Sequence, residues 1–322
     1  MTRDLYKKYR EQLKFNYQPQ VFWLHMTKDL ALWSSVVFLM QQSWPWAWLA
    51  VFPIAALLFR NLVFMHEAVH GVAHGNKLIN EFLGFVSGAL CFLPYKLWRS
   101  IHIEHHYWAG NFRQDSALEL VKRYPSHSAL TKSIFEVMWK TRFPWMALFQ
   151  YVVFWAHSTK RLLKSFEDGD FWLSYFTPLL FWGGVLWALN SQQLLVLGGG
   201  ILVYSLFFDY INLAHHGGIT FEEFYDKKPT WEQLEIARTG RYPKWIEDLV
   251  LNFNFHAEHH MFPDLPWNEL PKAHNLLMND GHNKHYAIVG PGWLRQQRKK
   301  SFAEFIRPDL YGEGPASSKK AA

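Results

Sequence analysis

Two long stretches of this chain contain no Asp, Glu, Lys or Arg, and they limit the possible folds more than any other feature. They are residues 30–59 and 171–208, and the second is 38 residues long. A helix that crosses a bilayer needs roughly 20 apolar residues, so the second stretch can form two spans. Polar residues 190–193 near its middle suit the turn between them. A soluble domain of this size has little room for such a run, which makes a soluble fold the weaker alternative.

The first stretch has a polar break of the same kind. Residues 41–43 are Gln-Gln-Ser and are followed by Trp44-Pro45. With its flanking residues this stretch predicts a second hairpin, so we expect an all-α integral membrane fold with four spans in two hairpins. The expected spans are about residues 26–42, 44–65, 171–189 and 194–212. Two shorter apolar runs, 82–95 and 143–159, are expected to form interfacial or re-entrant helices.

Lys and Arg are absent from the proposed hairpin tips and are concentrated in the rest of the chain. By the positive-inside rule, both termini and the segments between the hairpins are cytoplasmic. We therefore expect a cytoplasmic N-terminal segment (1–29), a membrane domain (30–311) and a disordered tail (312–322). Residues 1–29 have no apolar core and do not resemble a cleaved secretory signal. The expected location is the inner membrane if the host is bacterial.

The net charge of +6 would suit nucleic acid or an anionic membrane surface. The apolar runs favour the membrane, and no nucleic-acid partner is expected. Cys91 is the only cysteine. This excludes internal disulfides, a cysteine-ligated iron–sulfur cluster and a four-cysteine zinc site.

The chain has 17 histidines, and many of them lie in four clusters on the side predicted to be cytoplasmic. The clusters contain His66, His70 and His74; His102, His105 and His106; His215 and His216; and His256, His259 and His260. Residues three or four apart on a helix share one face, so an H-x-x-H-H segment directs two or three imidazoles at one point. Imidazole binds Zn, Cu, Fe and Ni. Eight or nine such nitrogens are too many for one metal, which predicts two metal ions with four or five nitrogen ligands each.

The other histidines are expected to be polar surface residues. They are His25, His127, His157, His274, His282 and His285.

The first cluster also matches the HExxH pattern of zinc hydrolases, in which Glu67 would act as the base. An intramembrane zinc protease would need only one further ligand and would leave the H-x-x-H-H segments unexplained. Zinc performs no redox chemistry. Paired irons could activate O2, which an unactivated methylene C–H requires because no side chain is basic enough to deprotonate it. A carboxylate-rich di-iron bundle is not expected, because histidine dominates here.

These motifs resemble those of the membrane fatty acid desaturase family, a histidine-box superfamily that also contains hydroxylases and ketolases. The matching boxes are His66 and His70; His102, His105 and His106; and His256, His259 and His260. The resemblance runs from about residue 51 to residue 277. It includes Trp98-Arg99, Asp115, Phe262-Pro263 and Leu270-Pro271.

The resemblance implies a di-iron enzyme that uses O2 as co-substrate, most simply a desaturase that introduces a C=C bond. It also implies that His216 is an iron ligand and that Asn212 holds a metal-bound water, with His215 as the competing ligand. If Asn212 and His216 share a helix, their four-residue spacing favours His216. A related hydroxylase, carotenoid ketolase or oxidative decarboxylase would use the same histidines. A non-catalytic metal-binding membrane protein is the remaining alternative.

Some family features differ in this chain. The third box begins with His256 rather than Gln, so the chain does not resemble a front-end desaturase. It lacks the His-Pro-Gly-Gly signature of a fused haem domain. The electrons should therefore come from a separate donor, such as a ferredoxin with its reductase or a membrane haem protein. The substrate should be an acyl chain carried by CoA, an acyl carrier protein or a phospholipid.

Polar neighbours of the boxes have two possible roles. Glu67, Glu104 and Glu258 could orient a ligating imidazole through its second nitrogen, or they could be solvated or paired with Arg and Lys. Asp115 could hold a histidine of the second box or contact the substrate head group. His74 is expected to be exposed, with support of a ligand as the alternative. Lys96 and Arg99 could attract an acidic head group or fix the membrane interface.

Overall fold

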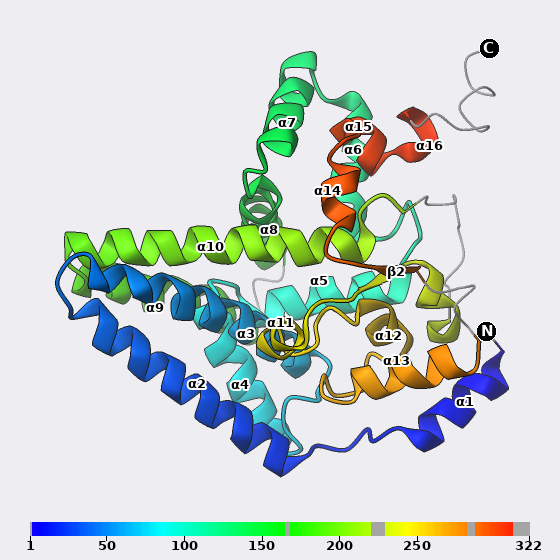
Figure 1. Cartoon of the computed structure of the whole chain (residues 1–322), viewed down its shortest axis with the longest axis horizontal. Helices are drawn as coiled ribbons and strands as arrows, with labels where there is room; N and C mark the ends of the chain where they lie inside the picture. Colours follow the sequence, from blue (N-terminus) through cyan, green and yellow to red (C-terminus); the bar gives the residue numbers. More distant parts are fainter. Residues whose placement is uncertain (1, 165–167, 220–228, 282–286, 312–322) are drawn as a thin grey trace.

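The uncharged stretches of the sequence form long helices that lie side by side. This computed structural model describes residues 2–164, 168–219, 229–281 and 287–311. Within them, α2 (Pro19–Met40) leads into α3 (Val51–Val69), and α9 (Gly169–Ala188) leads into α10 (Ser191–His216). Figure 1 shows both hairpin connections at the same end of the molecule, on the left. The predicted tail, His282 and His285 lie outside the described residues.

Three described segments are long and apolar enough to cross a bilayer. They are Trp46–Val69, Gly169–Ala188 and Ser191–His216, and they coincide with the second, third and fourth predicted spans. A further candidate exists only if α4 (Lys77–Leu90) and α5 (Tyr95–Trp108), bent by 101°, count as one broken span. The structure therefore supports a membrane protein with three or four candidate spans among the described residues.

The first predicted span, residues 26–42, falls in α2, which is not one of these candidates. Lys28 and Asp29 make the first half of α2 less apolar. Asp29 forms an ion pair with Arg60 of α3, and both residues are buried. The pair explains how Arg60 is accommodated inside an apolar helix, because a buried charge needs a partner. Helix α2 has 22 residues and is about 33 Å long.

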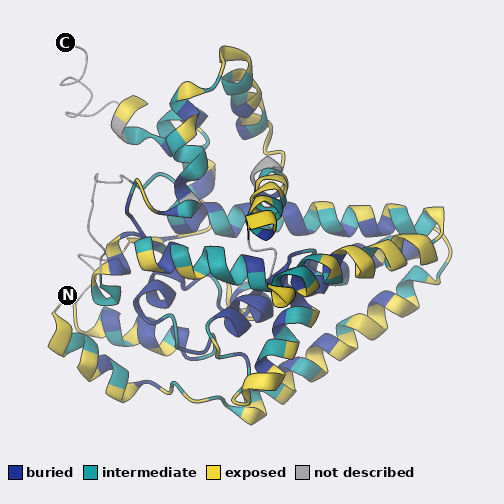
Figure 2. Ribbon diagram, turned by 180° about the vertical axis from the view of Figure 1, so that it is seen from behind, coloured by how far each residue is buried: buried dark blue, intermediate teal, exposed yellow. Residues whose placement is uncertain are grey.

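Large apolar side chains cover the outer surfaces of the long helices. On α9, Trp187 is 90% exposed and Leu180 is 74% exposed. Figure 2 shows exposed residues along the outer sides of these helices and mostly buried ones where the helices meet. Exposed apolar surface of this extent is typical of a membrane-contacting protein.

Helices α3 and α10 approach closely because glycine faces isoleucine between them. A Cβ atom on Gly200 would lie 2.4 Å from Cγ2 of Ile54. Phe59 and Val63 of α3 pack in the same core cluster as Ile211 of α10. This contact runs along both helices and places their far ends, which carry His66 and His216, close together.

The two shorter predicted apolar runs both form helices, and neither is long and apolar enough to cross a bilayer by itself. Residues 82–95 fall in α4 and in the sharp bend before α5. Residues 143–159 fall in α8 (Trp145–Lys164), which runs across α10 in Figure 1 and is not a candidate span.

Helix η1 (Trp46–Ala50) lies in the connection between α2 and α3. The remaining helices form the end of the molecule opposite the hairpin connections or pack beside it. They are α1 (Arg3–Gln12), η2 (Ser116–Leu118), α6 (Glu119–Arg123), η3 (Tyr124–Ser126), α7 (Ala129–Thr141), η4 (Thr230–Glu235), α11 (Lys244–Leu249), α12 (His256–Met261), α13 (Leu270–Asn279), α14 (Trp293–Gln297), α15 (Phe302–Ile306) and α16 (Pro308–Tyr311). The predicted all-α class omits one small feature. Strands β1 (Arg238–Gly240) and β2 (Ala287–Val289) pair in parallel, with Thr239 opposite Ile288.

Candidate metal centre

The predicted ligands meet where α3, α5, α10 and α12 come together, away from the hairpin connections. One set of five imidazoles, which we call the first histidine group, has one nitrogen of each ring within 4.8 Å of all the others. It contains His66, His70, His102, His106 and His259. The Nε2 atom of His102 lies 2.9 Å from Nε2 of His70 and 3.0 Å from Nε2 of His106.

A second set of imidazoles lies beside the first. His105, His216 and His260 each direct one nitrogen to a region where these atoms lie within 4.8 Å of one another. His256 joins them, because its Nε2 atom lies 2.8 Å from Nε2 of His216 and 3.2 Å from Nε2 of His260. We call these four residues the second histidine group.

The nitrogen separations can be compared with those in a real metal site. A zinc–imidazole bond is about 2.0–2.1 Å long, so two nitrogens bound at right angles to one such ion lie about 3 Å apart. The Nε2 atoms of His216, His256 and His260 form a triangle with sides of 2.8, 3.2 and 3.2 Å. Hydrogen bonds explain this triangle poorly, because neutral rings supply one N–H each and three Nε2 atoms meet here. The arrangement fits a shared metal ion.

Burial keeps these imidazoles neutral and able to coordinate. Removal from water, reinforced by neighbouring imidazoles, lowers the pKa of His256, His259 and His260 well below its usual value. Nε2 of His66 is buried and has no hydrogen-bond partner among the described residues. An unpaired buried nitrogen is costly, and a metal ion at this point would satisfy it.

Asp115 and Glu67 each contact a predicted ligand. Oδ1 of Asp115 accepts a hydrogen bond of 2.8 Å from Nδ1 of His105. Asp115 therefore contacts a histidine of the second box, which was one of the two roles expected for it. Oε1 of Glu67 lies 3.3 Å from Nδ1 of His66, and Oε2 accepts the Trp267 amide N–H at 3.0 Å.

The carboxylates of the other two box glutamates, Glu104 and Glu258, contact other residues than the predicted ligands in the described hydrogen bonds and ion pairs. Glu104 is part-exposed and pairs with Arg161 at 3.4 Å. Glu258 is fully buried but contacts none of the predicted ligands through its carboxylate in any described hydrogen bond. Its Oε1 atom accepts a hydrogen bond from His274 and its Oε2 atom accepts one from Thr239.

His216 and His215 occupy different positions at the end of α10. Nδ1 of His216 donates to the carbonyl of Ile236 at 3.0 Å, which leaves Nε2 facing the second histidine group. His215 belongs to neither group, and its ring stacks on that of His256 at 4.1 Å and 8°. Asn212 lies one turn before His216 on the same helix, as the same-face argument requires.

Other expected residues lie outside the centre. Nδ1 of His74 accepts the Asn76 amide N–H at 2.9 Å, and its ring packs on Tyr17. It is partly buried and in neither histidine group. Lys96 and Arg99 both form ion pairs with Glu81. Glu81 therefore partly neutralises the charges of both side chains.

Two predictions of surface histidines were wrong. His25 is 7% exposed and contacts Arg60, with 3.2 Å between Nδ1 and Nη2. His274 is 3% exposed. Their partners lie 35 and 16 residues away in the chain, so no local pattern indicates their burial.

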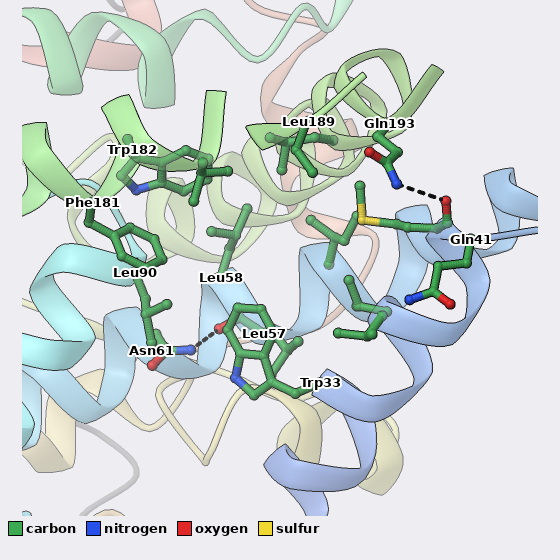
Figure 3. A pocket seen from close by; sticks show the side chains of 16 residues that line it. Trp33, Gln41, Leu57, Leu58, Asn61, Leu90, Phe181, Trp182, Leu189 and Gln193 are labelled. Carbon is green, nitrogen blue, oxygen red and sulfur yellow. Dashed lines mark hydrogen bonds between the residues drawn. The ribbon is translucent and has the colours of Figure 1, made fainter. Parts of the chain in front are cut away.

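An apolar cavity of about 280 Å³ lies between the long helices. Figure 3 shows Leu57, Leu58 and Asn61 of α3 on one side and Phe181 and Trp182 of α9 on another. Its lining also includes Ile54 and residues of α2 and α10. Asn61 is five residues before His66, which corresponds to a rise of about 7.5 Å along the axis of α3.

Known proteins resemble this chain over most of its length. The family model for fatty acid desaturases matches residues 42–291. An endoplasmic reticulum omega-3 fatty acid desaturase of Vigna radiata is 25% identical over 259 residues, 74% of this chain and 66% of the relative. A fatty acid desaturase of Bacillus subtilis is 25% identical, with 68% and 65% covered.

A chloroplastic sn-2 acyl-lipid omega-3 desaturase (ferredoxin) of Helianthus annuus is 24% identical, with 71% of this chain and 54% of the relative covered. The matches therefore span about half to two thirds of the length of these relatives.

Proposed function

The chain belongs to the fatty acid desaturase family, and from this membership we propose that it is an O2-dependent di-iron oxidoreductase that introduces a double bond into a lipid acyl chain. The observation that carries the proposal is the convergence of nine imidazoles from four separate segments into two adjacent groups. The names of the curated relatives favour desaturation over hydroxylation, ketone formation or decarboxylation.

Each histidine group would hold one iron. The first would use His66, His70, His102, His106 and His259. The second would use His105, His216, His256 and His260, with Asn212 contributing through a water. Bound there, the irons would supply the oxidising power that an unactivated C–H bond requires.

The protein's own residues would align this centre and exclude water from it. Asp115 would hold the His105 ring by its Nδ1–H, and the Ile236 carbonyl would hold the His216 ring in the same way. Most of the nine imidazoles are buried, which protects the reaction from side reactions with solvent.

The cavity between α2, α3, α9 and α10 would take part of the acyl chain. It is lined mainly by Leu, Val, Ile, Phe and Trp side chains, and it lies close to the first histidine group along α3. Apolar pockets of this kind bind ligands through burial of apolar surface. The acyl carrier, whether CoA, a carrier protein or a phospholipid, would remain at the membrane surface.

An external donor would complete the electron balance. Removal of two hydrogens from the acyl chain supplies two of the four electrons that reduce O2 to two waters, so a donor must supply the other two with two protons. The ferredoxin in the name of the Helianthus annuus relative supports a ferredoxin with its reductase.

We place α2 as the first of four spans, with both termini and the histidine groups on the cytoplasmic side. The clustering of Lys and Arg away from the hairpin connections supports this orientation.

A zinc protease built on the first box is disfavoured by the position of Glu67. Its two carboxylate oxygens face His66 and the Trp267 amide, whereas a catalytic base must face a metal-bound water.

The direct test is to express the chain in a host with simple lipids and to compare fatty acids by mass spectrometry. We expect new fatty acids that lack two hydrogens, and none from a His259→Ala control. A product that gains one oxygen would show that the chain is a hydroxylase and not a desaturase. An unchanged profile with a suitable donor present would contradict the proposal.

A further inference from the structure

The third histidine box lies on a helix too short to hold its own orientation. Helix α12 spans only six residues, His256–Met261, and its N-cap residue, Phe255, makes no side-chain capping bond. An isolated helix of this length is unstable in water. Contacts with the rest of the protein must therefore fix the directions of His256, His259 and His260.

Two of these imidazoles receive no such support through their own rings. Nδ1 of His256 and Nδ1 of His259 are buried and lack hydrogen-bond partners among the described residues. Metal-bound histidines usually donate that second N–H to a carboxylate or carbonyl, which orients the ring. Here the orientation must come from the helix itself.

Glu258 is the side chain that ties the back of α12 to its surroundings. At about 100° per residue, Glu258 lies on the opposite side of the helix from the three histidines. It is fully buried. Its Oε1 atom lies 2.6 Å from Nδ1 of His274 on α13, and its Oε2 atom accepts a hydrogen bond from the Thr239 hydroxyl on β1.

Arg241 determines which nitrogen of His274 carries the proton. Nη1 of Arg241 lies 2.9 Å from Nε2 of His274, and a guanidinium can only donate. Nε2 must therefore accept, so the proton is on Nδ1, which donates to Glu258. The Phe255 ring packs against the His274 ring at 5.3 Å.

From these contacts we infer that His274, which lies outside every histidine box, is a positioning residue for the metal centre. It holds Glu258 and so sets the angle at which α12 presents ligands to both histidine groups. The inference rests on the proposed function, because it assigns His274 a role toward the metals that this function requires.

The test compares two amide substitutions at position 274 in the full chain. In His274→Asn, the side-chain NH2 occupies the place of Nδ1–H and can donate to Glu258. In His274→Gln, the amide reaches the place of Nε2 and leaves Glu258 without that donor. Co²⁺ binding, followed by visible absorption in detergent, gives the affinity without any need for catalysis.

We expect His274→Gln to weaken Co²⁺ binding about 10- to 100-fold, while His274→Asn stays within a few-fold of the wild-type chain. Tyr9→Phe is the matched stability control. It removes a hydroxyl that donates to Asp280, the residue that follows α13, at 2.8 Å, and should lower the melting temperature without weakening Co²⁺ binding.

Equal Co²⁺ affinity in both position-274 variants would overturn the inference. So would a loss of affinity that only follows melting temperature across all three variants. A wild-type chain that binds no Co²⁺ would contradict the proposed function, and the inference would fall with it.

Discussion

At the scale of single residues, Asp115 is the carboxylate tied most directly to a predicted ligand. Its contact with Nδ1 of His105 is 2.8 Å long, and Asp115 is 1% exposed. Asp115→Ala would leave that ring without its orienting partner. We expect metal affinity to fall about 10- to 100-fold, as measured by Co²⁺ titration of the purified chain.

Glu104→Gln is the control for this prediction. Its side chain is 40% exposed and pairs with Arg161 at 3.4 Å, and exposed pairs contribute at most about 1 kcal/mol. Metal affinity should not change. A similar loss in both variants would show that the second box tolerates no substitution, and Asp115 would have no special role.

The box glutamates show where sequence reasoning stops at this scale. Each of Glu67, Glu104 and Glu258 lies between two histidines of its box, so the sequence alone does not distinguish their roles. Their environments are decided by Trp267, Arg161 and His274, which lie 200, 57 and 16 residues away. Only tertiary packing distinguishes them, and the same packing buries His25 and His274 against expectation.

At the scale of elements, the α3–α10 contact depends on glycine. Gly200→Ala would place a methyl group 2.4 Å from Cγ2 of Ile54. Overpacking of this kind costs about 1–3 kcal/mol, so thermal unfolding in detergent should shift to a lower temperature.

Gly198→Ala is the matched control on the same helix, because its added Cβ would meet nothing within 4 Å. It should be neutral, or stabilising by about 0.5–1 kcal/mol, since alanine favours a helix over glycine. Equal effects of the two substitutions would rule out the close approach.

The cavity predicts how acyl chain length is limited. Leu58 is 9% exposed and lines the cavity, so Leu58→Trp should fill part of it. The longest acyl chain that is desaturated should then become shorter, as read from the product fatty acids. Leu180→Trp, at a position 74% exposed on α9 and outside the lining, should leave chain length unchanged. A shift with Leu180→Trp alone would exclude this cavity.

Much of the helix arrangement could be predicted at this scale, because absence of charge over long runs has few structural explanations. The second, third and fourth predicted spans coincide with apolar helices. No sequence pattern indicated that Asp29 of α2 would form an ion pair with Arg60 of α3. The sequence also could not show the 101° bend between α4 and α5, because a bend depends on packing partners.

At the scale of the whole molecule, the position of α2 decides the topology. Four spans leave both termini on one side of the membrane, whereas the three apolar candidates alone would leave them on opposite sides. Fluorescent-protein fusions at each end, which fluoresce when cytoplasmic, should both be bright. Alkaline phosphatase fusions at the same positions should be inactive, and activity at one end would contradict four spans.

The convergence of the two histidine groups is also a property of the whole molecule. The spacing within each box predicted that its imidazoles would share one direction, whereas His216 was implied by the family resemblance, with His215 as the alternative. The spacings did not predict how nine rings divide between the two groups. His105 and His106 are neighbours, yet they lie in different groups, since adjacent side chains on a helix point about 100° apart.

Iron content of the purified chain tests the central claim most directly. After reconstitution with Fe²⁺, we expect two irons per chain, with fewer in His259→Ala, which removes a ligand of the first group, and in His260→Ala, which removes one of the second. Mössbauer spectra should report nitrogen-rich iron. One iron or none in the wild-type chain, or an unchanged count in both variants, would contradict the account.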